Sequence, residues 1–223
     1  MKRLSLYLLL IVVLSLAVGG CSVGQKSVEL DEDRGWTPLN NNLHQVDGPP
    51  PGNPERAFRV YRSGAPSRST FQNWCTVYGI ERVIVMSGDA EAHELKYQGE
   101  GICQDIEVIY NIQQNHAEPV SDGFLEWFDA QVQRAEEDGV GLLFRCQTGS
   151  HRAGRTAAYY QMKYQGVPVD EAIEIMDHKG MLMPLFNPVL IPQVYALDDY
   201  IHGRPCSQEK KYCVEINSDK WLP

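Results

Sequence analysis

The residues with the clearest chemistry lie in segment 146–152, which reads CQTGSHR and places five residues between Cys146 and Arg152. A loop this short can direct successive backbone N–H groups at one point, which makes an anion-binding site where a helix begins. The planar guanidinium of Arg152 can close that site by holding two oxygens of a phosphate group. The same positive groups favour the thiolate form of Cys146, so the spacing predicts a nucleophile held against a bound phosphate. The residues expected to line this site are Gln147, Thr148, Gly149, Ser150 and His151.

The elements around this segment place the cysteine at the edge of a sheet. The apolar run 140–144 predicts a buried strand, and 154–165 predicts the helix that follows the loop. Strands alternating with helices predict an α/β fold with a mainly parallel central sheet flanked by helices. In such a sheet ligands collect at the carboxyl ends of strands, where Cys146 is placed. The other expected strands are 58–61, 82–86 and 106–112, and the other expected helices are 67–78, 90–98, 121–137, 169–178 and 188–200.

With its surroundings, this segment resembles the cysteine-dependent protein tyrosine and dual-specificity phosphatase superfamily, in particular its small atypical bacterial and fungal branch. The resemblance extends to the sequences YRSGAP at 61–66, GIERVI at 79–84, AAYYQM at 157–162 and DEA at 170–172. It implies a tyrosine/dual-specificity phosphatase-like catalytic domain over residues 57–202 and a phosphocysteine intermediate. It implies no metal and no cofactor, and a phosphorylated protein or small phosphomonoester as substrate.

Two other interpretations of the cysteine are weaker. A rhodanese-like sulfurtransferase also carries a cysteine loop over a parallel sheet, but its loop is usually one residue shorter. A structural cysteine beside a surface arginine is the second, and it leaves the polar sequence TGS at 148–150 without a purpose between strand and helix. Arg155 and Thr156 open the following helix, and roles in supporting the loop or on the helix surface both stay open.

Three positions depart from the superfamily pattern. Arg145 stands where a histidine usually precedes the nucleophile, and its positive charge can still favour the thiolate. Ala153 stands where a hydroxyl usually stabilises the departing thiolate, which predicts slow hydrolysis of the phosphoenzyme. The aspartate that usually acts as general acid is missing from 112–119, where His116 and Glu118 are the available acids. Asp122 is a third candidate, but a carboxylate in the first turn of a helix has a structural role.

These departures bear on the substrate and on the alternative function. A weak general acid favours aryl phosphates, because a phenolic leaving group needs little protonation. Relatives that act on inositol phosphates tend to carry lysine or arginine in the loop, whereas this loop is uncharged except at His151. We therefore expect a phosphotyrosine-like or small monoester substrate, with inositol phosphates as an alternative. A catalytically weak phosphate-binding module of the cell envelope is the rival interpretation.

The N-terminal end has the pattern of an export signal. Lys2 and Arg3 precede an apolar run at 4–18 that is shorter than the ~20 residues of a membrane-spanning helix. The sequence VGGC at 18–21 resembles a bacterial lipobox, which implies removal of residues 1–20 and lipidation of Cys21. The protein would then be anchored to the cell membrane or outer membrane, facing the periplasm or exterior. An uncleaved anchor helix is the alternative. Residues 21–56 are polar and predict a flexible tether.

Charge and cysteines complete the expectations. The net charge of −9 argues against binding to nucleic acid and to anionic lipid, so membrane contact is expected through the anchor only. Export permits disulfides, and the short interval from Cys206 to Cys213 favours a bridge in the C-terminal tail, 203–223. Cys75 and Cys103 are the remaining pair, although the four cysteines allow three connectivities. No two histidines have the helical spacing of metal ligands, so no metal site is expected.

Overall fold

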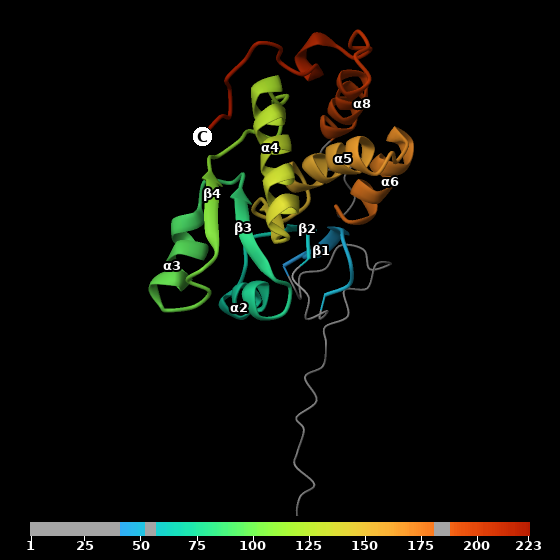
Figure 1. Cartoon of the computed structure of the whole chain (residues 1–223). Helices are drawn as coiled ribbons and strands as arrows, with labels where there is room; N and C mark the ends of the chain where they lie inside the picture. The colour runs from blue at the N-terminus through green and yellow to red at the C-terminus, as the bar shows by residue number, and fades with distance from the viewer. Residues whose placement is uncertain (1–40, 52–56, 181–187) are drawn as a thin grey trace, which may run out of the picture.

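The computed structural model describes residues 41–51, 57–180 and 188–223. The expected export signal, Cys21 and the first part of the expected tether lie outside these residues. A five-stranded sheet has the order β1-β2-β5-β3-β4 (Figure 1). Strands β2, β5, β3 and β4 are parallel, whereas β1 pairs with β2 in the antiparallel sense. The strands are β1 (His44–Asp47), β2 (Arg59–Ser63), β3 (Ile80–Val85), β4 (Glu107–Asn111) and β5 (Gly141–Arg145).

Helices cover both faces of the sheet (Figure 1). One face carries α4 (Asp122–Asp138), α5 (Arg152–Tyr164), α6 (Val169–His178) and α8 (Leu190–Ile201). The other carries α2 (Arg68–Thr76), α3 (Glu94–Gly99) and the short 3₁₀ helix Ala90–Ala92. A second 3₁₀ helix, Lys210–Tyr212, lies in the C-terminal segment. This arrangement confirms the predicted α/β fold with a mainly parallel sheet flanked by helices.

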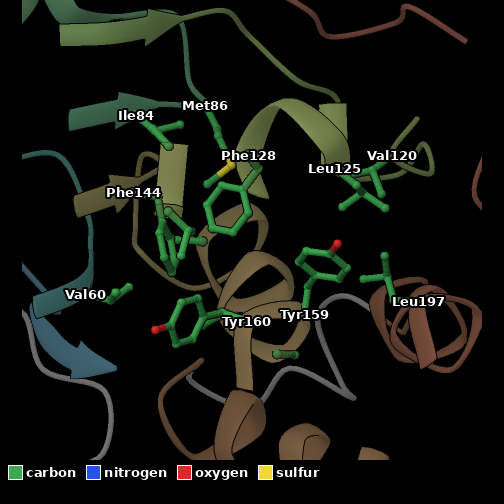
Figure 2. Close-up of a cluster of buried hydrophobic side chains, with 14 of the residues drawn as sticks. Val60, Ile84, Met86, Val120, Leu125, Phe128, Phe144, Tyr159, Tyr160 and Leu197 are labelled. Carbon is green, nitrogen blue, oxygen red and sulfur yellow. The ribbon is translucent and has the colours of Figure 1, made fainter. Parts of the chain in front are cut away.

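The alternation of side chains along each strand divides the core into two clusters. Leu142 and Phe144 of β5 pack with α4, α5 and α8, and Figure 2 shows Phe144 beside Phe128 in this cluster. Leu143 points to the opposite face and packs with Trp74 of α2. The alternation continues past the end of the strand, so Cys146 belongs to the same cluster as Phe144. Arg145 therefore faces the α2 and α3 side of the sheet.

Local signals set the ends of the two helices on either side of the sheet. The hydroxyl of Ser67 accepts a hydrogen bond from the backbone N–H of Thr70 (3.2 Å) and caps α2. Ser121 caps α4 in the same way, through the N–H of Phe124 (3.1 Å). Gly139 ends α4 with φ 63°, a conformation that glycine adopts without steric cost. The turn at Gly139 leads the chain directly into β5.

The expected tether, residues 21–56, includes residues that belong to the folded domain. Residues 41–47 belong to the folded domain, because β1 pairs with β2 and Leu43 is buried beside Tyr61. Asn41 and Asn42 both have positive φ, at 59° and 55°, which asparagine tolerates better than most residues. The carbonyl of Asn41 accepts a hydrogen bond from the N–H of Gly64 (2.7 Å). A polar composition was therefore a poor guide here, since these side chains and carbonyls contact the core of the domain.

Two disulfides join Cys75 to Cys103 and Cys206 to Cys213. The expected bridge in the C-terminal tail is confirmed, and one of the three connectivities is selected. The segment after α8 is also held by the domain, because the carbonyl of Trp221 accepts a hydrogen bond from the hydroxyl of Tyr110 (2.7 Å). Among the helices of the described residues, none combines the length and apolar character needed to cross a bilayer.

Candidate active site

Cys146 lies at the carboxyl end of β5 and is fully buried. Its backbone N–H donates to the carbonyl of Ser63 at the end of β2 (3.3 Å). The chain then turns through 147–151 and enters α5 at Arg152. The thiol was expected at the edge of the sheet, below a loop that leads into a helix, and the geometry agrees. The helix begins two residues earlier than expected, so the positive end of its dipole faces the loop.

The loop is closely packed against the turn that follows β2. The N–H of Ala65 donates to the carbonyl of Gln147 (3.1 Å), and Gly64 forms an isolated bridge with Thr148. Gly149 has φ 72°, and a Cβ at this position would lie 2.6 Å from the backbone nitrogen of Gly64. Only glycine fits there, for both its conformation and its space. The two glycines thus let two backbone segments meet and fix the path of the loop.

The segment before β1 also supports the loop. The side-chain amide of Asn42 donates to the carbonyls of Thr148 (3.3 Å) and Lys179 (3.0 Å). The oxygen of the same amide lies 2.8 Å from Nε2 of His44. Asn42 is buried, and its contacts connect the loop, the end of α6 and the start of β1. Nothing in the sequence indicated this role, because three consecutive asparagines at 40–42 resembled a linker.

Arg152 is held in place by two strand ends. Its Nη1 donates to the carbonyls of Met86 (2.8 Å) and Gln114 (3.0 Å), which follow β3 and β4. One edge of the guanidinium is therefore fixed on backbone oxygens. A rigid planar fork at the start of α5 is suited to binding two oxygens of a phosphate group.

Arg145 does not contribute its charge to the thiol. It is fully buried on the opposite face, where its Nε donates to Glu94 (2.7 Å) and its Nη2 donates to the other carboxylate oxygen of Glu94. Its Nη1 donates to Ser87 (2.7 Å) and Asp89 (2.5 Å). The expectation that this arginine favours the thiolate was wrong, because two carboxylates neutralise it and the pleat of β5 turns it away from Cys146.

Two histidines lie face to face at the loop. The rings of His116 and His151 are stacked, with centroids 5.3 Å apart and planes inclined by 29°. Burial, together with the charges of His116 and Arg152, lowers the pKa of His151 to about 4. His151 is therefore neutral near pH 7. The structure thus brings one expected acid, His116, to the loop that carries Cys146.

Glu118 is held differently. Its carboxylate lies 2.7 Å from Nζ of Lys220 and accepts a hydrogen bond from the side chain of Asn115 (2.8 Å). The hydrogen bond from Lys220 lowers the pKa of Glu118. A carboxyl group with a lowered pKa carries no proton to donate at neutral pH, so this arrangement weighs against Glu118 as the general acid. Asp122 accepts hydrogen bonds from the backbone of Asn217 and Ser218, which gives it a structural role. The identity of the acid stays a prediction.

The hydroxyl groups of the loop are engaged within the loop itself. Ser150 is buried, and its hydroxyl donates to the carbonyl of Thr148 (3.5 Å). The hydroxyl of Thr148 accepts from the N–H of Ser150 (3.4 Å). Ala153 is fully buried and offers no hydroxyl. The hydroxyl that usually follows the loop arginine is therefore missing here.

Two arginines lie near the loop. Arg62 was not singled out in the sequence as a site residue, and for Arg155 a role in supporting the loop or on the helix surface was left open. Arg62 on β2 and Arg155 on α5 are each only 1% exposed, and both interact electrostatically with Cys146. The signal for Arg62 was present, because an arginine inside a strand with five buried residues requires a buried partner. The burial of Arg155 could not be predicted from the helical periodicity of the sequence, because it depends on contacts with Gln193 and with the backbone of Glu118.

Comparison with known proteins supports the fold. No protein-family model matches the chain, and no curated protein matches it in sequence. Among solved structures, TpbA from P. aeruginosa matches with a TM-score of 0.54 and 20% identity, over 79% of this chain and 93% of that chain. PTPMT1 in complex with PI(5)P matches with a TM-score of 0.53 and 13% identity, over 72% and 97%. Tk-PTP matches with a TM-score of 0.51 and 17% identity, over 69% and 94%. The chain therefore has the fold of these phosphatases.

Proposed function

We propose that this protein is a cysteine-dependent phosphatase that hydrolyses phosphate monoesters through a phosphocysteine intermediate. One observation carries the proposal. A buried thiol lies at the carboxyl end of a central parallel strand, below a five-residue loop, and the arginine that closes the loop is fixed on two backbone carbonyls. Phosphate is the ligand that suits a loop of this kind at the start of a helix.

The reaction has two steps. In the first, the thiolate of Cys146 attacks phosphorus, the S–P bond forms, and the ester P–O bond breaks with its electron pair on the departing oxygen. Backbone N–H groups of 147–152 and the guanidinium of Arg152 bind the three phosphate oxygens and their developing charge. In the second step water attacks phosphorus, the S–P bond breaks, and inorganic phosphate leaves. The electron pair of the S–P bond returns to sulfur.

We assign the proton donor of the first step to His116 in preference to Glu118. His116 stacks on a residue of the loop, whereas the carboxylate of Glu118 is paired with Lys220. A protonated imidazole can give its proton to an alcohol or phenol oxygen near neutral pH. The backbone carbonyl of His116 accepts a hydrogen bond from Gln193 (3.2 Å), which links this segment to α8.

The loop favours a substrate with one phosphate group. Gln147, Thr148 and Ser150 carry no charge, and His151 is neutral at pH 7. A cysteine-to-serine variant of TpbA has been solved in complex with pTyr, and PTPMT1 in complex with PI(5)P. We infer a phosphotyrosine-like protein or small-molecule substrate, because residues 147–151 include no lysine or arginine that could bind a second phosphate group. An inositol phosphate is the alternative, and a panel of both substrate types distinguishes them.

We further propose that the protein is exported and lipid-anchored through Cys21. Two disulfides in the domain support an oxidising compartment. Metabolic labelling with a fatty acid tests the anchor directly. The unmodified chain should carry the label and sediment with membranes, whereas Cys21→Ala should carry none. Label on the Cys21→Ala chain would exclude this site of lipidation.

Hydrolysis of an aryl phosphate tests the activity. The full chain in detergent is assayed without metal and with a mild reductant, beside Cys146→Ser. Phosphate release by the parent and none by the variant is the expected result, and acid quenching should trap the phosphocysteine. A folded parent chain that binds vanadate but releases no phosphate would favour the phosphate-binding module instead. A persulfide on Cys146 without phosphate release would favour sulfurtransfer.

A further inference from the structure

Two buried arginines lie next to the loop without carboxylate partners. Nη2 of Arg62 donates to the carbonyl of Gly149 (2.6 Å), and Nη1 of Arg155 donates to the carbonyl of Glu118 (2.8 Å) and to the amide oxygen of Gln193. Nε and Nη1 of Arg62, and Nε and Nη2 of Arg155, have no hydrogen-bond partner within the described residues. Each guanidinium thus retains its charge and several donors in the interior of the protein.

The fold aims both arginines at the side of the sheet that holds Cys146. In the parallel pairing of β2 with β5, Arg62 is opposite Phe144, which shares a face with Cys146. Nη2 of Arg62 lies within 3.4 Å of where a Cβ on Gly154 would be, so it reaches the first turn of α5. Arg155 belongs to the same turn and follows Arg152 by three residues. Arg62 and Arg155 therefore lie next to the loop, on the face of the sheet that holds Cys146.

Burial of two cations without an anion is unfavourable, which makes the arrangement informative. Burial lowers the pKa of Arg62 to about 10 and the pKa of Arg155 to about 10. Both therefore remain protonated at neutral pH. In each case the negative charge of Cys146 opposes the effect of burial. A negative charge on Cys146 would balance them.

We propose that Arg62 and Arg155 are positioning residues that hold Cys146 as a thiolate. The role of the two arginines in hydrolysis of the phosphocysteine, described next, rests on the phosphatase reaction proposed above. When water attacks the phosphocysteine and the S–P bond breaks, the electron pair returns to sulfur, and both guanidinium groups stabilise its negative charge. They supply stabilisation of the departing thiolate that Ala153, which has no hydroxyl, does not provide. They also replace the charge of Arg145, which is neutralised on the other face.

Other groups act on the same sulfur and set the size of the expected effect. Arg152 and the N-terminal end of α5 contribute positive potential, and His151 is neutral above about pH 4. His116 stacks on His151 and adds charge when it is protonated. Loss of one buried arginine should therefore shift the pH at which the thiol ionises without abolishing the thiolate. A shift of about one pH unit corresponds to a tenfold change in the ionisation constant.

Titration of the thiol tests the proposal without any need for turnover. The full chain in detergent carries Cys21→Ser in every variant, so that Cys146 is the one free thiol beside two disulfides. The ultraviolet absorbance of the thiolate is followed against pH, with the matching Cys146→Ser chain subtracted. Arg62→Met and Arg155→Met should each raise the midpoint by about one unit, and the double variant should raise it further. Arg62→Lys and Arg155→Lys keep the charge and should remain near the parent.

Arg59→Met is the matched control. Arg59 is also a buried arginine of β2, but it donates to the carbonyls of Pro49 and Ala57, away from the loop. Its removal should leave the midpoint unchanged. An unchanged midpoint in folded Arg62→Met and Arg155→Met would overturn the proposal. If a methionine variant does not fold, the lysine variant serves as the test. A Cys146 thiol that ionises like a free cysteine in the lysine variant would also overturn the proposal. If the methionine variants raise the midpoint as expected but the parent protein releases no phosphate, the role of the arginines is supported and the phosphatase reaction is contradicted.

Discussion

Buried arginines lie on both faces of the sheet at its carboxyl end, with carboxylate partners on one face and without them on the other. On the α2 and α3 side, Arg145 is bonded to Glu94, Asp89 and Ser87, so its charge is balanced. On the α5 side, Arg62 and Arg155 bond to carbonyl and amide oxygens and keep several donors unused. The two regions are adjacent, since Arg145 and Cys146 are consecutive in the chain.

The difference indicates two separate tasks. A paired buried charge fixes an arrangement of elements, here the attachment of α3 to the end of β5. A buried charge without a carboxylate partner favours an anion beside it, and we assign that anion to the thiolate of Cys146. The first region should therefore respond to mutation in stability, and the second in the ionisation and reactivity of Cys146.

The largest expected effect is on the paired side. Glu94→Ala leaves Arg145 in the interior without its main partner, and loss of one member of a buried ion pair typically costs about 3–5 kcal/mol. The free energy of unfolding, measured with urea, should fall by this order. The pH of thiol ionisation should not change in the protein that remains folded. A coupled shift of that midpoint would mean that the two regions are not independent.

A double substitution sharpens the same test. Glu94→Leu combined with Arg145→Leu removes both charges and fills the space with apolar side chains. Replacement of a whole buried pair by apolar residues is often close to neutral. The double variant should therefore unfold near the parent. If it is as unstable as Glu94→Ala, the loss arises from packing and not from an unpaired charge.

The next effect is expected in catalysis. His116→Asn should lower the turnover of an alkyl phosphate by about 10²-fold or more, the usual contribution of a general acid. Turnover of an aryl phosphate with a good leaving group should fall much less. Glu118→Gln is the matched variant, and it should change neither rate appreciably because Lys220 already holds Glu118 ionised. A larger loss in Glu118→Gln than in His116→Asn would reverse the assignment.

Much of the fold followed from the sequence. Apolar runs located β3 and β5, and the expected helices 67–78 and 121–137 agree with α2 and α4 within a few residues. Strand β1 was missed because it has only four residues, HQVD, and its pairing depends on contacts distant in the sequence. The expected helix at 90–98 is divided into a 3₁₀ turn and α3, because His93 between them has a non-helical conformation.

The site was predicted where it depends on local spacing, and not where it depends on packing. Cys146 and Arg152 follow from the loop that connects a strand to a helix. The orientation of Arg145 was available from the two-residue period of β5, which places neighbours on opposite faces. Neither Arg155 nor Asn42 could be assigned, because their contacts come from α8 and from a segment that resembled a linker.

A smaller effect is expected from Asn42, which joins the segment before β1 to the loop. Asn42→Ala removes two hydrogen bonds from a buried side chain to the carbonyls of Thr148 and Lys179, which should lower the free energy of unfolding by about 1–3 kcal/mol. Asn217→Ala is the matched control, since Asn217 has nearly the same φ (54° against 55°) but is exposed. Both variants replace an asparagine, which tolerates positive φ, with alanine. The difference between their losses of unfolding free energy therefore measures the side-chain contacts of Asn42. Equal losses would mean that backbone conformation alone explains Asn42.

The smallest effect concerns pH. The pKa of His151 is lowered from 6.5 to about 4, so the unfolded chain takes up a proton below pH 6.5 that the folded protein refuses until about pH 4. Stability should therefore fall as pH decreases through this window and should not change further below it. His151→Asn should remove about 1 kcal/mol of this decline, since solvent reaches the ring and screens its charge.

The paired side gives the contrast for this last test. Although burial opposes it, hydrogen bonds from Ser87 and Arg145 lower the pKa of Asp89, so this carboxylate stays ionised through most of the same window. The difference between parent and His151→Asn, followed by urea unfolding at several pH values, therefore reports on the loop side. Parallel curves would mean that His151 titrates equally in the folded and unfolded chains. The loop would then already carry a second cation in acid, and the inference that it suits one phosphate group would lose its basis.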